Sequence, residues 1–185
     1  MRIFVETERL ILREILPQDI EGLFELDSDT DVHRFLGNKP VVNKNQIRDK
    51  IDFFKQQYDE NGIGRWAIIE KKSNNFIGWT GLKYVTQLTN NHINYYDLGY
   101  RLIKRFWGYG YATESAIASL DYGFENLDIN EIFAMAEVGN ANSNKILTKL
   151  GLEFIETFYH NGKLHKWYKV DKKNWNKERR TSNKQ

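Results

Sequence analysis

Two glycines separated by one residue form the most informative part of this sequence. Gly108 and Gly110 lie between an alternating segment that ends near Ile103 and a helical segment that follows at once. Glycine accepts backbone conformations that other residues avoid, so such a loop can point successive N–H groups into one concavity at the positive end of a helix. Lys104 and Arg105 can add positive charge there. The segment therefore predicts a site for an anion such as phosphate.

Several other chemistries are excluded by what the sequence lacks. The loop has neither the G-x-G-x-x-G spacing of a dinucleotide-binding fold nor the Gly-Lys-Ser/Thr of a P-loop. The chain has no cysteine, which rules out disulfides, thiolate metal sites and a cysteine nucleophile. Its four histidines, at positions 33, 92, 160 and 165, lack the close spacing of a zinc site, so we expect no metal.

The charge of the chain is unevenly distributed. The 185 residues carry a formal net charge of +2, but the last fifteen contain six Lys or Arg and two Asp or Glu. Because this tail carries +4, the remaining 170 residues carry −2, which is not the charge of a nucleic-acid-binding body. We expect a solvated basic tail at residues 171–185 and no nucleic-acid partner.

Length and hydropathy predict one domain, at residues 1–170, in a soluble protein. No apolar run approaches the roughly 20 residues of a membrane-spanning helix, and the N-terminus is too charged for a signal peptide. We therefore expect a cytoplasmic protein with no membrane partner.

The segments around the glycine loop predict a layered domain. Alternating or short apolar runs predict strands at residues 9–14, 65–71, 76–85, 91–103, 131–138, 152–159 and 163–170. Apolar spacings of three and four predict helices at residues 17–26, 29–36, 43–61, 112–127 and 141–150. Asn140 and Gly151 are expected to begin and end the last helix, and Asn161–Gly162 to form a hairpin turn. This order predicts an α/β (α+β layered) domain with a single mixed, mostly antiparallel sheet flanked by helices.

Four segments resemble the GNAT N-acetyltransferases, which hold acetyl-coenzyme A. Arg105-x-x-Gly108-x-Gly110 resembles their pyrophosphate-binding loop. Residues 107–114 resemble the branch that includes the Rim-type enzymes, which acetylate the N-termini of ribosomal proteins. Residues 7–13, 76–81 and 140–151 are similar to the opening strand, the middle strand and the second crossover helix of that branch. The segments occur in the expected order, so the resemblance implies a GNAT-like fold.

The resemblance implies acetyl-coenzyme A as the co-substrate, bound without a metal. It implies that main-chain N–H groups bind the pyrophosphate at Gly108, Gly110, Tyr111, Ala112 and Thr113. Arg105 would add charge to this site. The backbone of Tyr100 and Leu102 would pair with the pantetheine amides, as an additional strand would. Asn140 would cap its helix while its amide reaches the pantetheine arm.

The resemblance also implies direct acetyl transfer in a ternary complex, which fits a chain without cysteine. Ser143 is then the candidate acid for the leaving thiolate, although a serine at a helix start also serves as a cap. Asp97 stands where the family often has an acidic residue, either as a base acting through water or as an anchor for the incoming ammonium. Strand alternation places it on one face with Arg101, so a pair with Arg101 or a surface lysine is the structural alternative. For His165, on the last strand, we expect an ordinary position on the sheet surface, and the alternative is that it faces the substrate.

These residues predict an acetyl-coenzyme A-dependent N-acetyltransferase acting on a primary amine, by resemblance a protein N-terminal α-amine. A small-molecule amine (amino acid, polyamine or drug) is one alternative, and a non-catalytic acyl-coenzyme A sensor is another. The presence of both loop glycines, Asn140 and Ser143 favours an enzyme. The acceptor depends on loops 28–45 and 85–93, whose shape no motif predicts. The oligomeric state is open, and a homodimer is compatible with the sequence.

Overall fold

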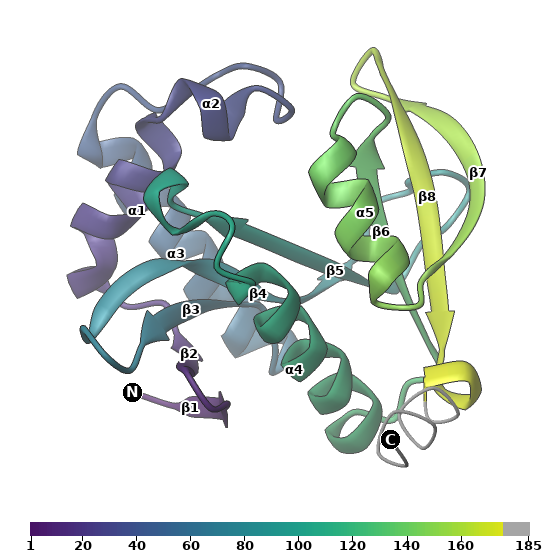
Figure 1. The fold of residues 1–185 in the computed structure, drawn as a ribbon, viewed down its shortest axis with the longest axis horizontal. Helices are drawn as coiled ribbons and strands as arrows, with labels where there is room; N and C mark the ends of the chain where they lie inside the picture. The colour runs from purple at the N-terminus through teal and green to yellow at the C-terminus, as the bar shows by residue number, and fades with distance from the viewer. Residues whose placement is uncertain (176–185) are drawn as a thin grey trace.

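A computed structural model describes residues 1–175, which fold around one sheet (Figure 1). The strands are β1 (Ile3–Glu6), β2 (Leu10–Glu14), β3 (Arg65–Glu70), β4 (Asn75–Val85), β5 (Tyr95–Leu102), β6 (Glu131–Glu137), β7 (Glu153–His160) and β8 (Lys163–Asp171). The helices are α1 (Ile20–Ser28), α2 (Thr30–His33), α3 (Lys44–Asn61), α4 (Tyr111–Asn126) and α5 (Ala141–Lys149). Two 3-10 turns, η1 (Pro17–Asp19) and η2 (Lys104–Phe106), precede α1 and the glycine loop.

The strands form a single mixed sheet in the order β1-β2-β3-β4-β5-β6-β8-β7. Neighbouring strands are antiparallel except β5 and β6, which are parallel and are connected through α4. The second crossover, through α5, carries the chain from β6 to β7 at the edge of the sheet. The predicted fold class is thus confirmed.

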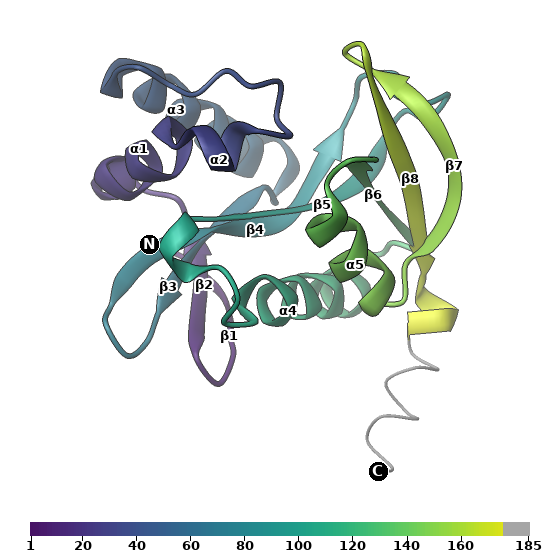
Figure 2. The ribbon, with the colours of Figure 1, turned by 45° about the horizontal axis from the view of Figure 1, so that its top comes forward.

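Helices cover both faces of the sheet (Figure 2). The segment between β2 and β3 places α1, α2 and α3 on one face, and α4 covers the other. Side chains of β3 alternate between these faces: Ile68 belongs to the core beneath α4, whereas Ala67 and Ile69 pack with Ile47 and Ile51 of α3. We call the two sides the α4 face and the α3 face. Within residues 1–175, no helix combines the length and the apolar character needed to cross a membrane.

Local signals in the sequence account for most element boundaries. The Asn43 side chain caps α3 by accepting hydrogen bonds from the backbone of Asn45 and Gln46. The hairpin turn at Asn161 and Gly162 is confirmed, with φ of 50° and 76°, as a two-residue turn between twisted strands requires. The sequence interpretation missed β1, because four residues at a chain end carry too little alternation to predict a strand.

The described chain ends against α4. The Trp175 ring is 5% exposed and packs near Phe124, and its indole N–H donates to Asp121 Oδ1 at 2.9 Å. The rest of the expected basic tail, residues 176–185, lies outside the described residues.

Candidate active site

The glycine loop lies between β5 and α4. Gly108 and Gly110 both have a φ of 83°, in the left-handed region that glycine adopts without strain. A Cβ atom on Gly108 would meet no heavy atom within 4 Å apart from its chain neighbours, so this backbone borders open space. Glu114 N–H donates to Gly110 O at 3.0 Å. The N–H groups of residues 111–113 come before this first helical hydrogen bond and have no acceptor in the helix. The loop therefore fits an anionic group such as pyrophosphate.

The N-terminal segment clamps this loop from outside. Arg9 Nη1 donates to the Tyr109 carbonyl at 3.0 Å, and the guanidinium lies 4.5 Å from the centroid of the Tyr111 ring. Glu114 accepts hydrogen bonds from Arg9 Nε at 2.7 Å and from the Thr7 hydroxyl at 2.6 Å. Burial disfavours the charge of Glu114, but the hydrogen bonds from Thr7 and Arg9 outweigh burial and lower its pKa. Residues 7–13 and 107–114 are both motifs in the sequence, but only the fold shows that they are in contact.

Lys104 and Arg105 turn toward the α1–α2 segment. Lys104 Nζ lies 2.5 Å from a carboxylate oxygen of Asp31, and the Arg105 guanidinium pairs with Glu25. Both basic side chains are about half exposed. Contact between Arg105 and a phosphate would require this guanidinium to leave Glu25, so its role in anion binding stays a prediction.

β5 and β6 separate before the glycine loop begins. In the described residues they share one pair, Asp97 with Phe133, although both strands continue for several residues. Figure 1 shows the strands running apart from this point. On its other edge β5 stays paired with β4 as far as Leu102, whose carbonyl also accepts a hydrogen bond from the Trp107 indole at 2.9 Å. In the described residues, the β5 backbone beyond Asp97, which includes Tyr100 and Leu102, is therefore not paired with β6.

Ser143 lies in the first turn of α5 and contacts β5 through a tyrosine. Its hydroxyl is 3.2 Å from the Tyr100 hydroxyl. Burial raises the pKa of Tyr100 to about 12, so this phenol keeps its proton at neutral pH. The phenol donates to the Ser143 backbone carbonyl at 3.2 Å, and in the contact between the two hydroxyls either one can be the donor. The helix cap uses the backbone N–H of Ser143, which donates to Asn140 Oδ1 at 3.1 Å. Asn140 is therefore the cap, and the Ser143 hydroxyl is not needed for it.

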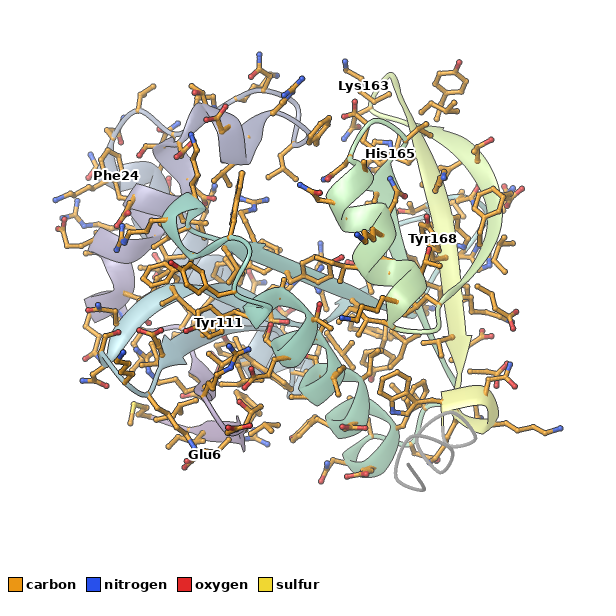
Figure 3. The ribbon with its side chains drawn as sticks, viewed as in Figure 1. Glu6, Phe24, Tyr111, Lys163, His165 and Tyr168 are labelled. Atoms are coloured by element: carbon orange, nitrogen blue, oxygen red, sulfur yellow. The ribbon has the colours of Figure 1, made fainter. Side chains whose placement is uncertain are left out.

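A buried asparagine fixes the start of α5, and sequence analysis gave it no role. Asn144 Nδ2 donates to the carbonyls of Asn140 at 2.8 Å and Glu137 at 3.0 Å, and Asn144 Oδ1 accepts from the Tyr168 hydroxyl at 2.7 Å. Figure 3 labels Tyr168 on β8, beside α5. These bonds tie the first turn of α5 to β6 and β8, and so they position Ser143. The only signal in the sequence was its place beside Ser143.

Asp97 lies on the α3 face, at the point where β5 and β6 separate. Its carboxylate pairs with the Arg65 guanidinium, which also donates to the Asp97 backbone carbonyl at 2.7 Å. A Cβ atom on Gly99 would lie 2.7 Å from the guanidinium carbon, so this glycine makes room for Arg65. The alternative pair with Arg101 does not form, because Arg101 pairs with Asp27 at 2.5 Å. Protonation of Asp97 would therefore break a buried ion pair.

A second buried carboxylate joins the helices of the α3 face to β5. Asp27 of α1 lies 2.6 Å from Lys50 of α3, 2.5 Å from Arg101 of β5 and 3.5 Å from His33 of α2. Burial disfavours the charge of Asp27, but Arg101 and Lys50 outweigh burial and lower its pKa. Both buried carboxylates on this side of β5 are thus occupied by cations.

The described part of the chain holds no group of three or more His, Cys, Asp or Glu residues arranged to bind a metal ion. The site instead provides the backbone N–H groups of residues 111–113 as donors for an anion, and the hydroxyls of Ser143 and Tyr100 as groups that can pass on a proton. This combination suits transfer of a group from a phosphate-containing donor.

Comparisons with known proteins agree with this geometry. Residues 9–153 match the acetyltransferase (GNAT) domain family. A Bacillus licheniformis protein described as the uncharacterized N-acetyltransferase p20 is 32% identical over 147 residues, 80% of this chain and 80% of that protein. The structure of RimL, a ribosomal L7/L12 α-N-protein acetyltransferase in complex with coenzyme A, has a TM-score of 0.76 at 18% identity and covers 92% of this chain and 98% of its own. Spermidine N-acetyltransferase from Vibrio cholerae, with coenzyme A and spermine, has a TM-score of 0.73 at 16% identity over 91% of this chain and 99% of its own.

The chain belongs to the GNAT acetyltransferase family. It is an N-acetyltransferase that takes its acetyl group from acetyl-coenzyme A, so the predicted family and reaction class are confirmed. The two solved structures carry names with different acceptors, a ribosomal protein and a polyamine, and at this level of identity they show the fold alone.

Proposed function

We propose that this chain acetylates protein N-terminal α-amines by direct transfer within a ternary complex. In this proposal the main-chain N–H groups of Gly108, Gly110, Tyr111, Ala112 and Thr113 hold the pyrophosphate of acetyl-coenzyme A. Arg105 adds charge after it leaves Glu25. The pantetheine arm lies along Tyr100 and Leu102, with Asn140 near it, and brings the thioester beside Ser143.

The choice of acceptor rests on the two buried carboxylates that form ion pairs beside β5, Asp97 and Asp27. Asp97 is held by Arg65, and Asp27 by Arg101 and Lys50. A polyamine carries several ammonium groups and needs several free carboxylates. Asp27 already has two cationic partners, and Asp97, which has one, can take one further ammonium at most. An α-amine carries one charge and has a pKa of about 7.7–8.0, against about 10.4 for a lysine-type amine. It therefore gives up its proton readily near neutral pH.

The transfer requires two protons to move. The ammonium loses one before its nitrogen can attack the thioester carbon. As the carbon–nitrogen bond forms and the carbon–sulfur bond breaks, the nitrogen loses a second proton, and the sulfur gains one. Ser143, bonded to Tyr100 at 3.2 Å, can give a proton to the sulfur and receive one in turn. Asp97 serves better as an anchor for the ammonium than as a base, because it is already bound to Arg65.

A panel of matched acceptors tests this proposal. The full chain is incubated with acetyl-coenzyme A and short peptides with a free N-terminus, the same peptides with a blocked N-terminus and an internal lysine, spermidine, and free amino acids. We expect thiol release and one added acetyl group on the peptides with a free N-terminus. Preferential acetylation of spermidine or of amino acids would overturn the choice of acceptor. Coenzyme A binding with no turnover on any amine would instead support the sensor alternative.

A further inference from the structure

A cluster of aromatic and imidazole rings lies on the α3 face of β6, β7 and β8. His160 of β7 and His165 of β8 have ring centroids 5.6 Å apart, and Phe158 lies 6.1 Å from the first and 6.0 Å from the second. The buried Trp167 ring packs 5.3 Å from Phe158 and 5.3 Å from Phe133 of β6. Since Phe133 is the pairing partner of Asp97, this cluster continues the face on which Asp97 lies.

His165 lies at the end of β6 from which the chain enters the turn before α5. It pairs with Glu137, the last residue of β6. One step further, Val138 N–H donates to the Leu164 carbonyl at 2.9 Å, which binds the start of β8 to this turn. Figure 3 labels His165 on this part of β8, opposite the first turns of α5. His165 and Ser143 therefore lie at the same end of β6, on opposite faces of the sheet.

One hydrogen bond indicates which nitrogen of His165 carries the proton. His165 Nδ1 lies 3.0 Å from the Lys163 carbonyl, which can only accept, so Nδ1 bears the hydrogen. In the neutral ring Nε2 then has a free lone pair. In His160 the corresponding nitrogen lies 3.3 Å from the Asn161 side-chain amide, which can donate to it. Of the two rings, His165 is thus the one with an available basic atom.

Other groups at this place are less suited to take a proton. Asp97 is engaged by Arg65, and Tyr100 keeps its own proton at neutral pH. The pKa of His160 is lowered, first by burial and then by the charge of His165, while the charge of Asp97 opposes this.

We propose that His165 is the base that removes the first proton from the acceptor ammonium, and this inference rests on the proposed function. His165 Nε2 takes that proton and later releases it to solvent. The freed nitrogen bonds to the thioester carbon, the carbon–sulfur bond breaks, and the second amine proton reaches the sulfur through Ser143. The products are the N-acetylated acceptor and free coenzyme A. In this proposal His165 is a catalytic residue, which corresponds to the alternative in which it faces the substrate.

The charged groups around His165 determine when it can act. His160 faces it from β7, Glu137 adjoins it on β6, and Lys163 shares its face of β8. Asp97 on β5 acts on the pair electrostatically through His160. A ring that carries protons on both nitrogens has no lone pair to accept another, so a histidine base requires activity to fall in acid.

The test compares His165→Gln with a control on the neighbouring strand, Tyr159→Phe. Tyr159 pairs with Leu164, the residue before His165, and is 77% exposed. We expect His165→Gln to lower kcat roughly 10²-fold, the scale of a lost general base. Its pH–rate profile should lose the inflection due to histidine and keep rising as the amine loses its own proton. KM for acetyl-coenzyme A should not change, and the control should keep the wild-type profile.

Two results would overturn this inference. One is an unchanged pH–rate profile in His165→Gln when the wild type acetylates N-terminal peptides, and this leaves the proposed function intact. The other is an NMR result on the wild type, which requires no variant to fold. If the ring nitrogen signals show no histidine with a protonated Nδ1 that titrates at the pH of the kinetic inflection, the inference is wrong. Absence of N-terminal acetylation by the wild type is a separate result, which refutes the proposed function itself.

Discussion

The proposed donor side and the proposed acceptor side of this site are built in different ways. On the donor side, Gly108, Gly110 and the first turn of α4 present backbone groups, and their geometry depends on residues close together in the sequence. On the acceptor side, side chains such as Arg65, Asp97 and His165 come from β3, β5 and β8 and meet only in the folded sheet. Backbone recognition needs few specific residues and suits a constant ligand. Recognition by side chains can change without altering the fold, which fits the different acceptors named for RimL and for the Vibrio cholerae enzyme.

The largest effect, on coenzyme A binding, is expected from a side chain that would fill the proposed pyrophosphate site at Gly108. In Gly108→Trp the indole would occupy the open space at the loop and displace the pyrophosphate. Loss of two hydrogen bonds to a charged group, at about 1.5–3 kcal/mol each, weakens binding by at least roughly 100-fold. Calorimetry with coenzyme A measures this. Gly62→Trp is the matched control, since Gly62 also has a positive φ, 68°, and open space around it. Equal binding in both variants would refute the pyrophosphate site.

A smaller effect is expected at Ser143, where substitution should slow acetyl transfer without weakening coenzyme A binding. Ser143→Ala should lower turnover roughly 10–10³-fold, the scale of a lost proton donor, while coenzyme A binds nearly normally. The melting temperature should stay unchanged, because the cap uses the Ser143 backbone N–H and the Asn140 side chain. Thr148→Ala, which removes a hydroxyl further along the same helix, should keep full turnover. Normal turnover with a lower melting temperature would make Ser143 a structural residue only.

Substitution of Asp97 is expected to weaken binding of the acceptor amine. Asp97→Asn removes the charge that anchors the ammonium, so KM for the acceptor should rise roughly tenfold, as for one hydrogen bond to a charged group. The shape of the pH–rate profile should persist. Asp27→Asn removes another buried carboxylate of the same face and should leave this KM nearly unchanged. If activity of Asp97→Asn recovers at high pH, Asp97 is the base, and the assignment to His165 fails.

The smallest effect is expected at the clamp of the glycine loop. Glu114→Gln removes the charge opposite Arg9, and for this partly exposed pair we expect about 0.5–1 kcal/mol, a two- to fivefold rise in KM for acetyl-coenzyme A with kcat unchanged. Because the pKa of Glu114 is lowered, its ion pair is complete above the ordinary glutamate value of ~4.3 and is lost as the pH falls through the lowered pKa. Donor binding by the wild type and the variant should therefore converge in acid. Glu125→Gln, on the same helix, should show no effect; a persistent difference in acid would mean that the clamp acts without Glu114's charge.

The contrast between the two sides also explains what could be predicted from the sequence. Periodicity and capping signals placed the helices and strands, and local spacing placed the glycine loop, because these depend on neighbours within a few residues. The partner of Asp97 could not be predicted: Arg65 is 32 residues away and reaches it only because β4 lies between their strands. The bond between Tyr100 and Ser143 likewise spans 43 residues and requires α5 to start at its observed place.

The single pair between β5 and β6 also bears on how the molecule is held together. The sheet consists of two hydrogen-bonded blocks, β1 to β5 and β6 to β8, whose ladder is interrupted between them. In the proposed site a pantetheine arm would lie in this gap along β5, so the donor would add hydrogen bonds where the ladder is interrupted. A ligand that binds only the folded chain stabilises it by about 2.7 kcal/mol at 100 times its Kd. The enzyme's resistance to unfolding, and not only its activity, would then follow the concentration of acetyl-coenzyme A around it.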